Sequence, residues 1–460
     1  MLAALLNLPK NCLSTEILVF GYPEGPQSPT PKKSLNELAF FDRNNSNDER
    51  PQQPVLGVIN VKILFKIFTG VFGLALVLVA TLFIALSLIN SPGYAWRILT
   101  LLSSDTQDYK VFPSRPIENA ATFSPLERGH QATPYQVAYR YQDGIRTETF
   151  DNLLQRTETR AFLIIKDDQL IFETYLESSR SEINTSFSVA KAFDSALIGA
   201  AIADGYITSV DDPVIKYVPE IAGRGLDVLT IRNLLRMDSG IRYRSENEIL
   251  APFSDDALTY YSPDLRRVAF GVQPGKMPIG AAFCYNNFHP LLEGLILERA
   301  TGMPVAEYLQ ERLWKPLGAE FPASWSLDSE ASGFEKMESG INARAVDYAR
   351  FGLLYLHDGF WNGQQILPAD WIAESTRPDP TNTRSIETYP FWQEEGGYYG
   401  YHWWGLKNSD GSYDYSALGH LGQVIYVAPR KNMVVVRLGN ETDETVSWPF
   451  VIQALVNQMP

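Results

Sequence analysis

A serine and a lysine stand three residues apart at the start of a long apolar stretch, as Ser188 and Lys191. From Val189 to Ala203 the stretch carries two charges, Lys191 and Asp194, which predicts a helix buried on most of its circumference. Residues three apart share one helix face, so the hydroxyl and the amine are expected to meet. A serine needs a base at hydrogen-bond distance to become a nucleophile, and a lysine in dry surroundings loses its proton more easily. The alternative is an ordinary helix start whose lysine reaches out to water.

A second stretch offers another proton carrier. Residues 273–287 have the pattern of a tight turn, a short extended run and a helix start, and Tyr285 and Asn287 stand at its end. A tyrosine hydroxyl near Ser188 could relay a proton, and an asparagine side chain could hold Lys191 or a substrate carbonyl. A packed tyrosine and a capping asparagine explain the two residues equally well.

A third stretch places His420 between Gly419 and Gly422, immediately before a predicted strand that begins at Gln423. Glycines allow a ligand or a backbone to approach closely, and N–H groups at a strand start can donate to an oxyanion. A lone histidine at a strand start is more often structural than catalytic, and the flanking glycines favour a functional role here.

Taken in this order, the three stretches resemble the serine β-lactamase and penicillin-binding protein superfamily. The resemblance rests on Ser-x-x-Lys at 188–191, Tyr-x-Asn at 285–287 and His-x-Gly at 420–422. Within the superfamily the chain is most similar to the class C β-lactamase-related hydrolases and esterases, and closest to the 6-aminohexanoate-dimer hydrolase group. The resemblance covers about residues 155–460.

The resemblance implies a serine hydrolase that cleaves an ester or amide through an acyl intermediate on Ser188. Lys191 and Tyr285 would be the general base and acid of this reaction. The backbone N–H groups of Ser188 and Gln423 would form the oxyanion hole. The residues that the resemblance assigns to substrate and oxyanion binding are Asn287, His420, Gly422 and Gln423.

The third motif departs from that of β-lactamases and D,D-peptidases, which carry Lys-Thr/Ser-Gly at this place. Here His420 and Leu421 replace the cation and the hydroxyl that help to hold a substrate carboxylate. The departure favours esters or amides of other shapes, and a D,D-peptidase or β-lactamase proper stays open as an alternative. A module that binds penicillin or a peptidoglycan fragment without turnover is the alternative from a different class, and labelling of Ser188 by a fluorophosphonate separates it from a hydrolase.

Composition argues against several other classes. The formal charge of −14 argues against a nucleic-acid partner. The five histidines have no metal-ligand spacing, and Cys12 and Cys284 are too far apart in sequence to suggest a disulfide framework, so neither a metal nor another cofactor is predicted. The Gly-x-Ser-x-Gly elbow of Ser-His-Asp hydrolases is absent from the sequence. The sequence predicts a small ester, amide or peptide-like substrate and leaves the oligomeric state open.

The elements that must position these residues predict an α+β fold, and the resemblance implies that it is of the β-lactamase/transpeptidase-like, multi-domain type. Two β-rich runs within 161–176 predict a hairpin just before the Ser188 helix, and residues 184–186 offer N-cap oxygens for that helix. The remaining predicted elements are a helical lobe at about 207–335, strands at 398–406, 423–428 and 433–438, and a last helix at 448–458. The first and last strands are expected to join in one antiparallel sheet flanked by helices, with the all-helical lobe inserted and Ser188 at the junction.

The N-terminal part predicts a single-pass membrane protein. Residues 1–66 form a tail of disorder-prone composition, and Ile67–Ile89 carries no charge over a length that can cross a bilayer. Lys62 and Lys66 precede this span, so the Lys/Arg bias predicts a cytoplasmic N-terminus and a periplasmic catalytic domain at a bacterial inner membrane. A cleaved signal peptide is the alternative to this signal anchor. Residues 90–157 are predicted to form a stalk and N-terminal extension, and residues 158–460 the hydrolase domain.

Overall fold

The structure is a computed structural model that describes residues 61–123, 125–130, 136–141, 144–246, 248–379, 392, 396–440 and 446–459. The predicted tail up to residue 60 lies outside the described residues. Residues 71–460 form one compact unit, and the residues up to Gly70 belong to a separate unit.

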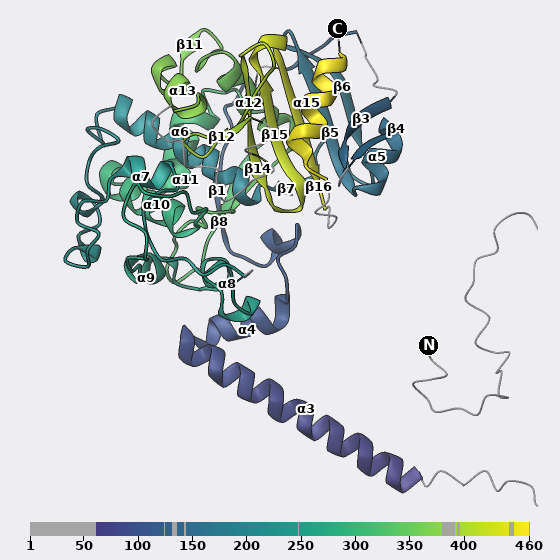
Figure 1. The fold of residues 1–460 in the computed structure, drawn as a ribbon, viewed down its shortest axis with the longest axis vertical. Coiled ribbons are helices and arrows are strands. Elements are labelled where there is room, and N and C mark those ends of the chain that lie inside the picture. The colour runs from purple at the N-terminus through teal and green to yellow at the C-terminus, as the bar shows by residue number, and fades with distance from the viewer. Residues whose placement is uncertain are drawn as a thin grey trace, which may run out of the picture. The chain divides into compact units, whose positions relative to one another are not determined.

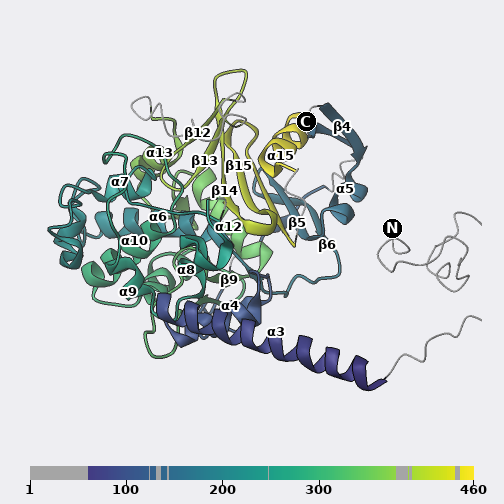
Figure 2. The same ribbon diagram turned by 60° about the horizontal axis from the view of Figure 1, so that its bottom comes forward.

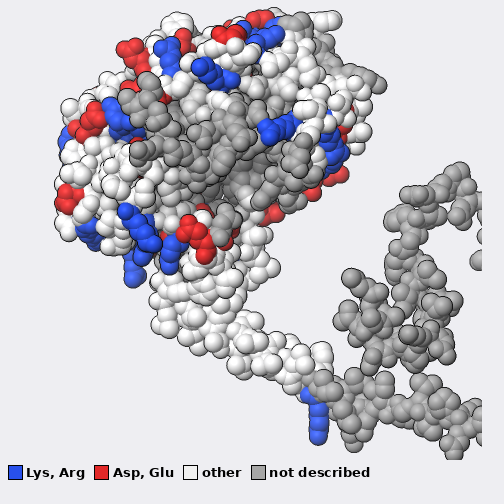
Figure 3. Space-filling model, viewed as in Figure 1, with Lys and Arg blue, Asp and Glu red and all other residues white. Residues whose placement is uncertain are grey.

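The predicted membrane span is helical. Helix α3 covers Val61–Ile89, and within the described part of the chain Phe68–Ile89 is the one helical stretch long and apolar enough to cross a bilayer, with a mean hydropathy of 2.7. Its large apolar side chains from Val71 to Val79 are exposed, and Figure 3 shows this helix without charged side chains along most of its length. This confirms a helix able to cross a bilayer, and its orientation stays a prediction.

The core of the unit is an eight-stranded sheet with the order β12-β13-β14-β15-β16-β5-β6-β2 (Figure 1). Its strands are β2 (Glu127–Arg128), β5 (Thr159–Lys166), β6 (Gln169–Tyr175), β12 (Gly397–Tyr399), β13 (Trp404–Lys407), β14 (Tyr413–Gly419), β15 (Gln423–Ala428) and β16 (Met433–Gly439). Every neighbouring pair is antiparallel except β2 and β6. The last strand β16 pairs with the first hairpin strand β5, so the predicted antiparallel sheet from both ends of the domain is confirmed.

Both faces of the sheet are covered by helices, as the alternation along β5 requires. Leu163 and Ile165 belong to the core on one face with α6 and α12, and Phe162 and Ile164 belong to the core on the other face with α5 and α15. The covering helices are α5 (Phe150–Arg156), α6 (Ala190–Ala203), α12 (Ala345–Leu356) and α15 (Trp448–Gln458). Burial of apolar area on both faces is the main stabilisation of this sandwich.

A lobe of short helices lies beside the sheet (Figure 1). Its helices are α7 (Ile231–Leu235), α8 (Asp255–Tyr261), α9 (Leu265–Phe270), α10 (Phe288–Thr301), α11 (Val305–Leu309) and a π-turn at Gln310–Trp314. A second sheet, of order β1-β8-β9-β7, consists of β1 (Ser114–Ile117), β7 (Asn184–Thr185), β8 (Ala323–Ser326) and β9 (Ile341–Ala343). Helix α13 (Ala369–Thr376) follows the β10–β11 hairpin, in which β10 (Phe360–Trp361) pairs with β11 (Gln364–Gln365).

The stretch that the sequence predicts as stalk and extension contains regular structure. It includes α4 (Pro92–Leu101), the β3–β4 hairpin (Gln136–Tyr141 and Gly144–Thr149) and strand β1. Buried side chains of α4 pack against α8, and the two helices lie side by side in Figure 2. The predicted continuous strand at 398–406 is wrong: β12 and β13 are separated by a tight turn in which His402 has φ +64°. A turn of this kind reverses the chain within a few residues, which apolar patterning does not reveal.

Candidate active site

Ser188 lies in a single 3-10 turn, Phe187–Val189, that leads directly into α6. The sequence predicts caps for this helix from residues 184–186, but none of these side chains caps α6. Ser186 instead donates its hydroxyl to the Ser339 carbonyl at 3.1 Å and accepts from the Ile341 N–H at 3.1 Å. Phe187 has φ +43°, a strained value for a non-glycine residue, which turns the chain sharply just before Ser188.

Lys191 is buried and reaches back to Ser188. Its Nζ lies 2.8 Å from Ser188 Oγ and donates to the Glu338 backbone carbonyl at 3.1 Å. The same Nζ lies 5.0 Å from the centre of the Tyr285 ring. The structure therefore brings the serine, the lysine and the tyrosine of the sequence prediction together around one amine.

Tyr285 is half-buried between the two lobes. Its ring packs against Trp404 at a centroid distance of 5.8 Å, and its chain is held by a hydrogen bond from Cys284 N to the Met237 carbonyl at 2.7 Å. Trp403 is fully buried in the core, so of the two adjacent tryptophans Trp404 is the one that contacts the site.

The two asparagines that follow Tyr285 have different surroundings. Asn286 is buried and accepts from the Phe288 N–H at 2.8 Å. Asn287 occupies the N-cap position of α10 without capping it, and its buried Oδ1 accepts no hydrogen bond from the described residues. Asn287 also lines the pocket beside Ser188, and its role in substrate binding stays a prediction.

The third motif forms the turn between β14 and β15. Leu421 and Gly422 both have positive φ, +58° and +76°, and His420 packs edge-on against Phe187 at 5.4 Å. A Cβ on Gly419 would lie 2.4 Å from the Ser186 carbonyl oxygen, so the strand lies directly against the segment that carries Ser188. Gly419 thus permits the close approach of a backbone that the sequence pattern predicts.

Gln423 uses its side chain to fasten this turn to the sheet. Its Nε2 donates to the Gly439 carbonyl at 2.6 Å, and its Oε1 accepts from the Gly439 N–H at 3.1 Å. The side chain is therefore structural, and a role in substrate binding is left to its backbone N–H.

Arg437 holds the same turn and was missed by the sequence analysis. This fully buried guanidinium donates to the carbonyls of Leu421 and Gly422, both at 2.8 Å, and lies 4.6 Å from the centre of the Trp448 ring. A single arginine inside the apolar strand Met433–Gly439 is the signal that could have identified it, because a buried cation needs such partners.

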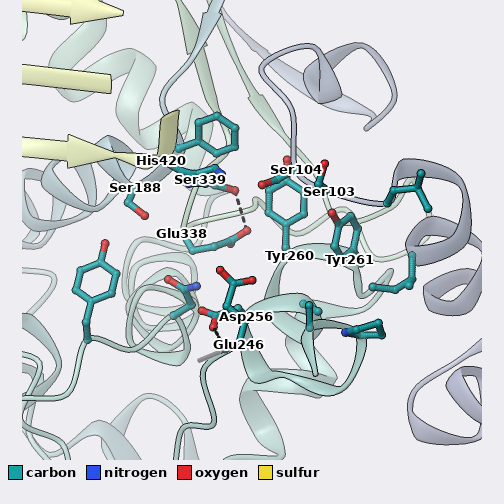
Figure 4. Close-up of a pocket in the computed structure, with 18 residues that line it drawn as sticks. Ser103, Ser104, Ser188, Glu246, Asp256, Tyr260, Tyr261, Glu338, Ser339 and His420 are labelled. Atoms are coloured by element: carbon teal, nitrogen blue, oxygen red, sulfur yellow. Dashed lines mark hydrogen bonds between the residues drawn. The ribbon is translucent and has the colours of Figure 1, made fainter. Parts of the chain in front are cut away.

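A pocket of about 450 Å³ contains Ser188, Tyr285, Asn287 and His420 in its wall. Figure 4 shows Ser188 and His420 at one end and Ser103, Ser104 and Tyr261 toward the other. The remaining lining residues are Ile98, Leu102, Phe187, Glu246, Ala251, Pro252, Asp256, Ala257, Tyr260, Glu338 and Ser339.

Three of the lining side chains are carboxylates, and no lysine or arginine appears among the described lining residues. Asp256 accepts from the Tyr243 hydroxyl at 2.5 Å, and Glu246 is exposed. Glu338 is buried, with Oε1 bound by Lys336 at 3.0 Å and by Ser339 at 2.8 Å, while its Oε2 has no partner among the described residues. Lys336 balances the charge of Glu338, whereas Glu246 and Asp256 form no ion pair with the described residues. The pocket is therefore negative beside these two side chains, which disfavours a substrate carboxylate there.

Further titratable groups are buried behind Lys191. Burial raises the pKa of Asp194 well above its usual range, and Glu293 adds to that effect. His402 binds the Glu293 carboxylate at 2.7 Å. Burial lowers the pKa of His289 to about 3, and its Nε2 lies 2.5 Å from Ser239 Oγ. In the part of the chain that the structure describes, no group of such residues has the arrangement of a metal site.

The chain is similar to several known proteins in sequence and in fold. The family model described as Beta-lactamase matches residues 147–455. A 6-aminohexanoate-dimer hydrolase of Paenarthrobacter ureafaciens is 26% identical over 344 residues, which cover 70% of this chain and 83% of the relative. A solved structure from Bacillus anthracis, named as a candidate 6-aminohexanoate-dimer hydrolase, is 24% identical to this chain and superimposes with a TM-score of 0.66. The match covers 77% of this chain and 91% of the Bacillus chain. The octameric penicillin-binding protein homologue of Pyrococcus abyssi shares the fold, with 20% identity and a TM-score of 0.52. The match covers 66% of this chain and 74% of the Pyrococcus chain.

Proposed function

The chain belongs to the β-lactamase family of serine hydrolases, and on that premise we propose that it cleaves an ester or amide through an acyl intermediate on Ser188. The observation that carries this proposal is the distance of 2.8 Å between Lys191 Nζ and Ser188 Oγ in a buried setting. A general base must lie within this range of the proton that it removes.

In the proposed reaction, Ser188 Oγ attacks the substrate carbonyl and its proton passes to Lys191 Nζ. The bond from the carbonyl carbon to the leaving oxygen or nitrogen then breaks, and the leaving group receives a proton through Tyr285. Water hydrolyses the acyl-serine in the reverse sense and restores the Ser188 hydroxyl. Tyr285 suits this role because its ring centre lies 5.0 Å from Lys191 Nζ and its side chain shares the pocket wall with Ser188. The oxyanion hole of this proposal consists of the backbone N–H groups of Ser188 and Gln423, and Gln423 directly follows the turn that carries His420.

The carboxylates in the pocket bear on the substrate class. Glu246 and Asp256, which form no ion pair with the described residues, repel a substrate carboxylate, the group that penicillins and D-Ala-D-Ala peptides carry close to the reacting bond. An ester or amide that is neutral or positively charged near the reacting carbonyl fits better. The name of the Paenarthrobacter relative makes a linear amide the first amide to test.

We also propose that α3 anchors the enzyme in a membrane with its catalytic domain on the non-cytoplasmic side. The length and hydropathy of Phe68–Ile89 support the anchor. Lys62 and Lys66 before the span support the orientation.

The test is a substrate panel with full-length protein in detergent. The panel contains p-nitrophenyl esters, a linear 6-aminohexanoate dimer, nitrocefin and a D-Ala-D-Ala peptide, with Ser188→Ala as the control. We expect turnover of esters or the linear amide by wild type, fluorophosphonate labelling of Ser188 and neither in the variant. Folded protein without labelling or turnover would favour the binding module, and preferential turnover of nitrocefin or the peptide would favour a β-lactamase or D,D-peptidase.

A further inference from the structure

The catalytic pocket extends well beyond the residues that the proposed chemistry uses. From Ser188 it continues past Glu338 to a second end near Tyr261, Ser103 and Ser104, against the helix α4 (Figure 4). Besides these residues, the wall at this second end has a group of mainly apolar side chains, namely Ile98, Leu102, Ala251, Pro252, Ala257 and Tyr260. A substrate with a small acyl group and a small leaving group would leave this end unused.

Helix α4 is a fixed wall of the pocket. The Arg97 guanidinium donates to the backbone carbonyls of Tyr261 at 3.2 Å and of Asp328 at 2.5 Å. The Tyr94 hydroxyl donates to the Pro252 carbonyl at 2.9 Å, and Tyr94 is buried in one cluster with Ala257 of α8. These contacts join α4 to the same segment, 252–261, that forms the facing wall, so the apolar end keeps a defined shape.

The apolar end of the pocket is also the end nearest to the apolar helix. Helix α3 ends at Ile89 and α4 begins at Pro92, and a ten-residue helix is only about 15 Å long. Large apolar side chains are exposed in this region, with Trp96 at 64%, Leu102 at 79% and Leu250 at 75%. Tryptophan is enriched where proteins meet the membrane–water interface.

We infer that the pocket takes an amphiphilic ester or amide from the bilayer, with its reacting carbonyl at Ser188 and its apolar chain along α4 and α8. This inference rests on the proposed function and adds the substrate class to it. The bond changes are those of the proposed acyl transfer: the Ser188 Oγ–carbonyl bond forms, the bond to the leaving alcohol or amine breaks, and water then releases the acid.

The first experiment measures chain-length preference with the full-length protein in detergent. Two ester series are used, one with the alkyl chain in the acyl group and one with the chain in the leaving alcohol, from two to twelve carbons. Each methylene buried is worth about fourfold in kcat/KM, so we expect a rise of at least about 100-fold along one series. A flat profile in both series, with Ser188 labelled by a fluorophosphonate, would overturn the inference and leave the proposed function intact.

Two variants test the wall itself. Ala257→Phe fills the apolar end and is expected to shift the preferred chain to a shorter length. Leu102→Asp, at a side chain exposed enough to tolerate the change, is expected to lower the long-to-short ratio at least tenfold. Ile145→Asp on β4 is the matched control, since Ile145 is 73% exposed and absent from the pocket wall, and it should leave that ratio unchanged. Equal ratios in wild type and Leu102→Asp would contradict the inference even if Ala257→Phe fails to fold.

The source of the substrate is tested in phosphatidylcholine vesicles with a fluorogenic long-chain ester. Flotation first shows that the enzyme is inserted. Hydrolysis is then compared for enzyme and ester in the same vesicles and in separate vesicles. Faster hydrolysis in the same vesicles supports delivery from the bilayer, whereas equal rates would show an aqueous source and overturn that part of the inference. Absence of Ser188 labelling and of any ester turnover would instead count against the proposed function.

Discussion

In the part of the chain that the structure describes, two lysines are buried, and they meet at the same glutamate. Lys191 donates to the backbone carbonyl of Glu338 at 3.1 Å, and Lys336 binds the carboxylate of the same residue at 3.0 Å. Lys336 also lies over the rings of Phe112 and Tyr260, at 4.7 Å and 4.2 Å. Lys191 has a serine hydroxyl and a tyrosine ring as its other neighbours.

The difference between the two lysines lies in their partners, because both are almost fully removed from water. Burial lowers the pKa of Lys336, while the Glu338 carboxylate opposes that shift and stabilises the charged form. No carboxylate of the described chain lies within ion-pair distance of Lys191. A buried lysine with a carboxylate is a structural cation, and one that faces a hydroxyl can exchange a proton with it.

The largest expected effect is on catalysis by Lys191→Met. If Lys191 is the base, this variant loses proton transfer, which is worth up to about 10⁴-fold, while a similar side-chain volume keeps the helix packed. We expect kcat/KM for the preferred ester to fall about 10³- to 10⁴-fold, measured at steady state. Urea unfolding should show little loss of stability, and a variant within tenfold of wild-type activity would remove Lys191 from the mechanism.

In contrast to Lys191→Met, the Lys336→Met variant should lose stability. It leaves the Glu338 carboxylate buried without its cation, which costs about 3–5 kcal/mol of unfolding free energy. The measurement is urea denaturation of the detergent-solubilised protein. The double variant Lys336→Met, Glu338→Gln should recover part of the loss, and a single variant as stable as wild type would show that Lys336 is no structural cation.

Tyr285→Phe keeps the ring that faces Lys191 and removes the hydroxyl. Loss of one proton carrier predicts a fall in kcat of about 10²-fold. The thermal midpoint should remain near that of wild type, because the contact with Trp404 is retained. An unchanged kcat, with acylation shown to limit the rate, would mean that the leaving group takes its proton elsewhere.

His289 extends the comparison to a buried base whose neutral form is favoured. Burial lowers its pKa in the folded protein to about 3, whereas an unfolded histidine titrates near 6.5. Because the pKa of His289 is lower in the folded than in the unfolded protein, the neutral imidazole stabilises the fold fully at pH values above the pKa of the unfolded state. This stabilisation is lost as the pH falls below that pKa. From pH 7 to pH 5 this linkage removes about 2 kcal/mol of unfolding free energy.

The measurement for His289 is urea unfolding at the two pH values. His289→Gln should reduce the difference between pH 7 and pH 5 by about 2 kcal/mol. His130→Gln, at an exposed histidine, should leave the difference unchanged. Equal pH dependence of both variants would rule out His289 as its source.

The smallest effect is expected at a lysine that is paired with a carboxylate near the surface. Lys315 binds Glu311 at 2.6 Å one helical turn away, and the side chains of Lys315 and Glu311 are 36% and 57% exposed. Surface pairs of this kind contribute under about 0.5 kcal/mol, so Lys315→Ala should hardly change the urea midpoint. A loss of unfolding free energy comparable with that of Lys336→Met would mean that burial does not decide how much a lysine–carboxylate pair contributes to stability.

The sequence allowed prediction of those parts whose pattern is local. The β5–β6 hairpin, the strand at 423–428 and the helix at 448–458 follow from alternation and apolar periodicity, and all are present. The proximity of Ser188 and Lys191 follows from helical spacing alone. Their approach to Tyr285 and His420 depends on long-range packing, and it was anticipated through the family resemblance.

Other parts of the site have no local signal. Glu338 contacts Lys191 through its backbone carbonyl, which any residue type could supply. Residues 184–186 have the composition of a helix cap but are used by β7 and by contacts with the segment 339–341. The contribution of α4 to the pocket depends on Arg97 reaching backbone carbonyls far along the chain, and carbonyl acceptors leave no trace in the sequence.

Because α4 forms part of the pocket wall, it belongs to the shortest stretch of chain that keeps the active site complete. The family match begins at residue 147, but Ile98 and Leu102 in the pocket wall and Phe112 against Lys336 all precede it. A soluble form cut at the family boundary would lose one side of its cleft and expose the Lys336 site. The cut that preserves both lies between Ile89 and Pro92. An exchange of the proposed anchor α3 for another segment, in the laboratory or in evolution, would therefore have to join the chain at that two-residue linker.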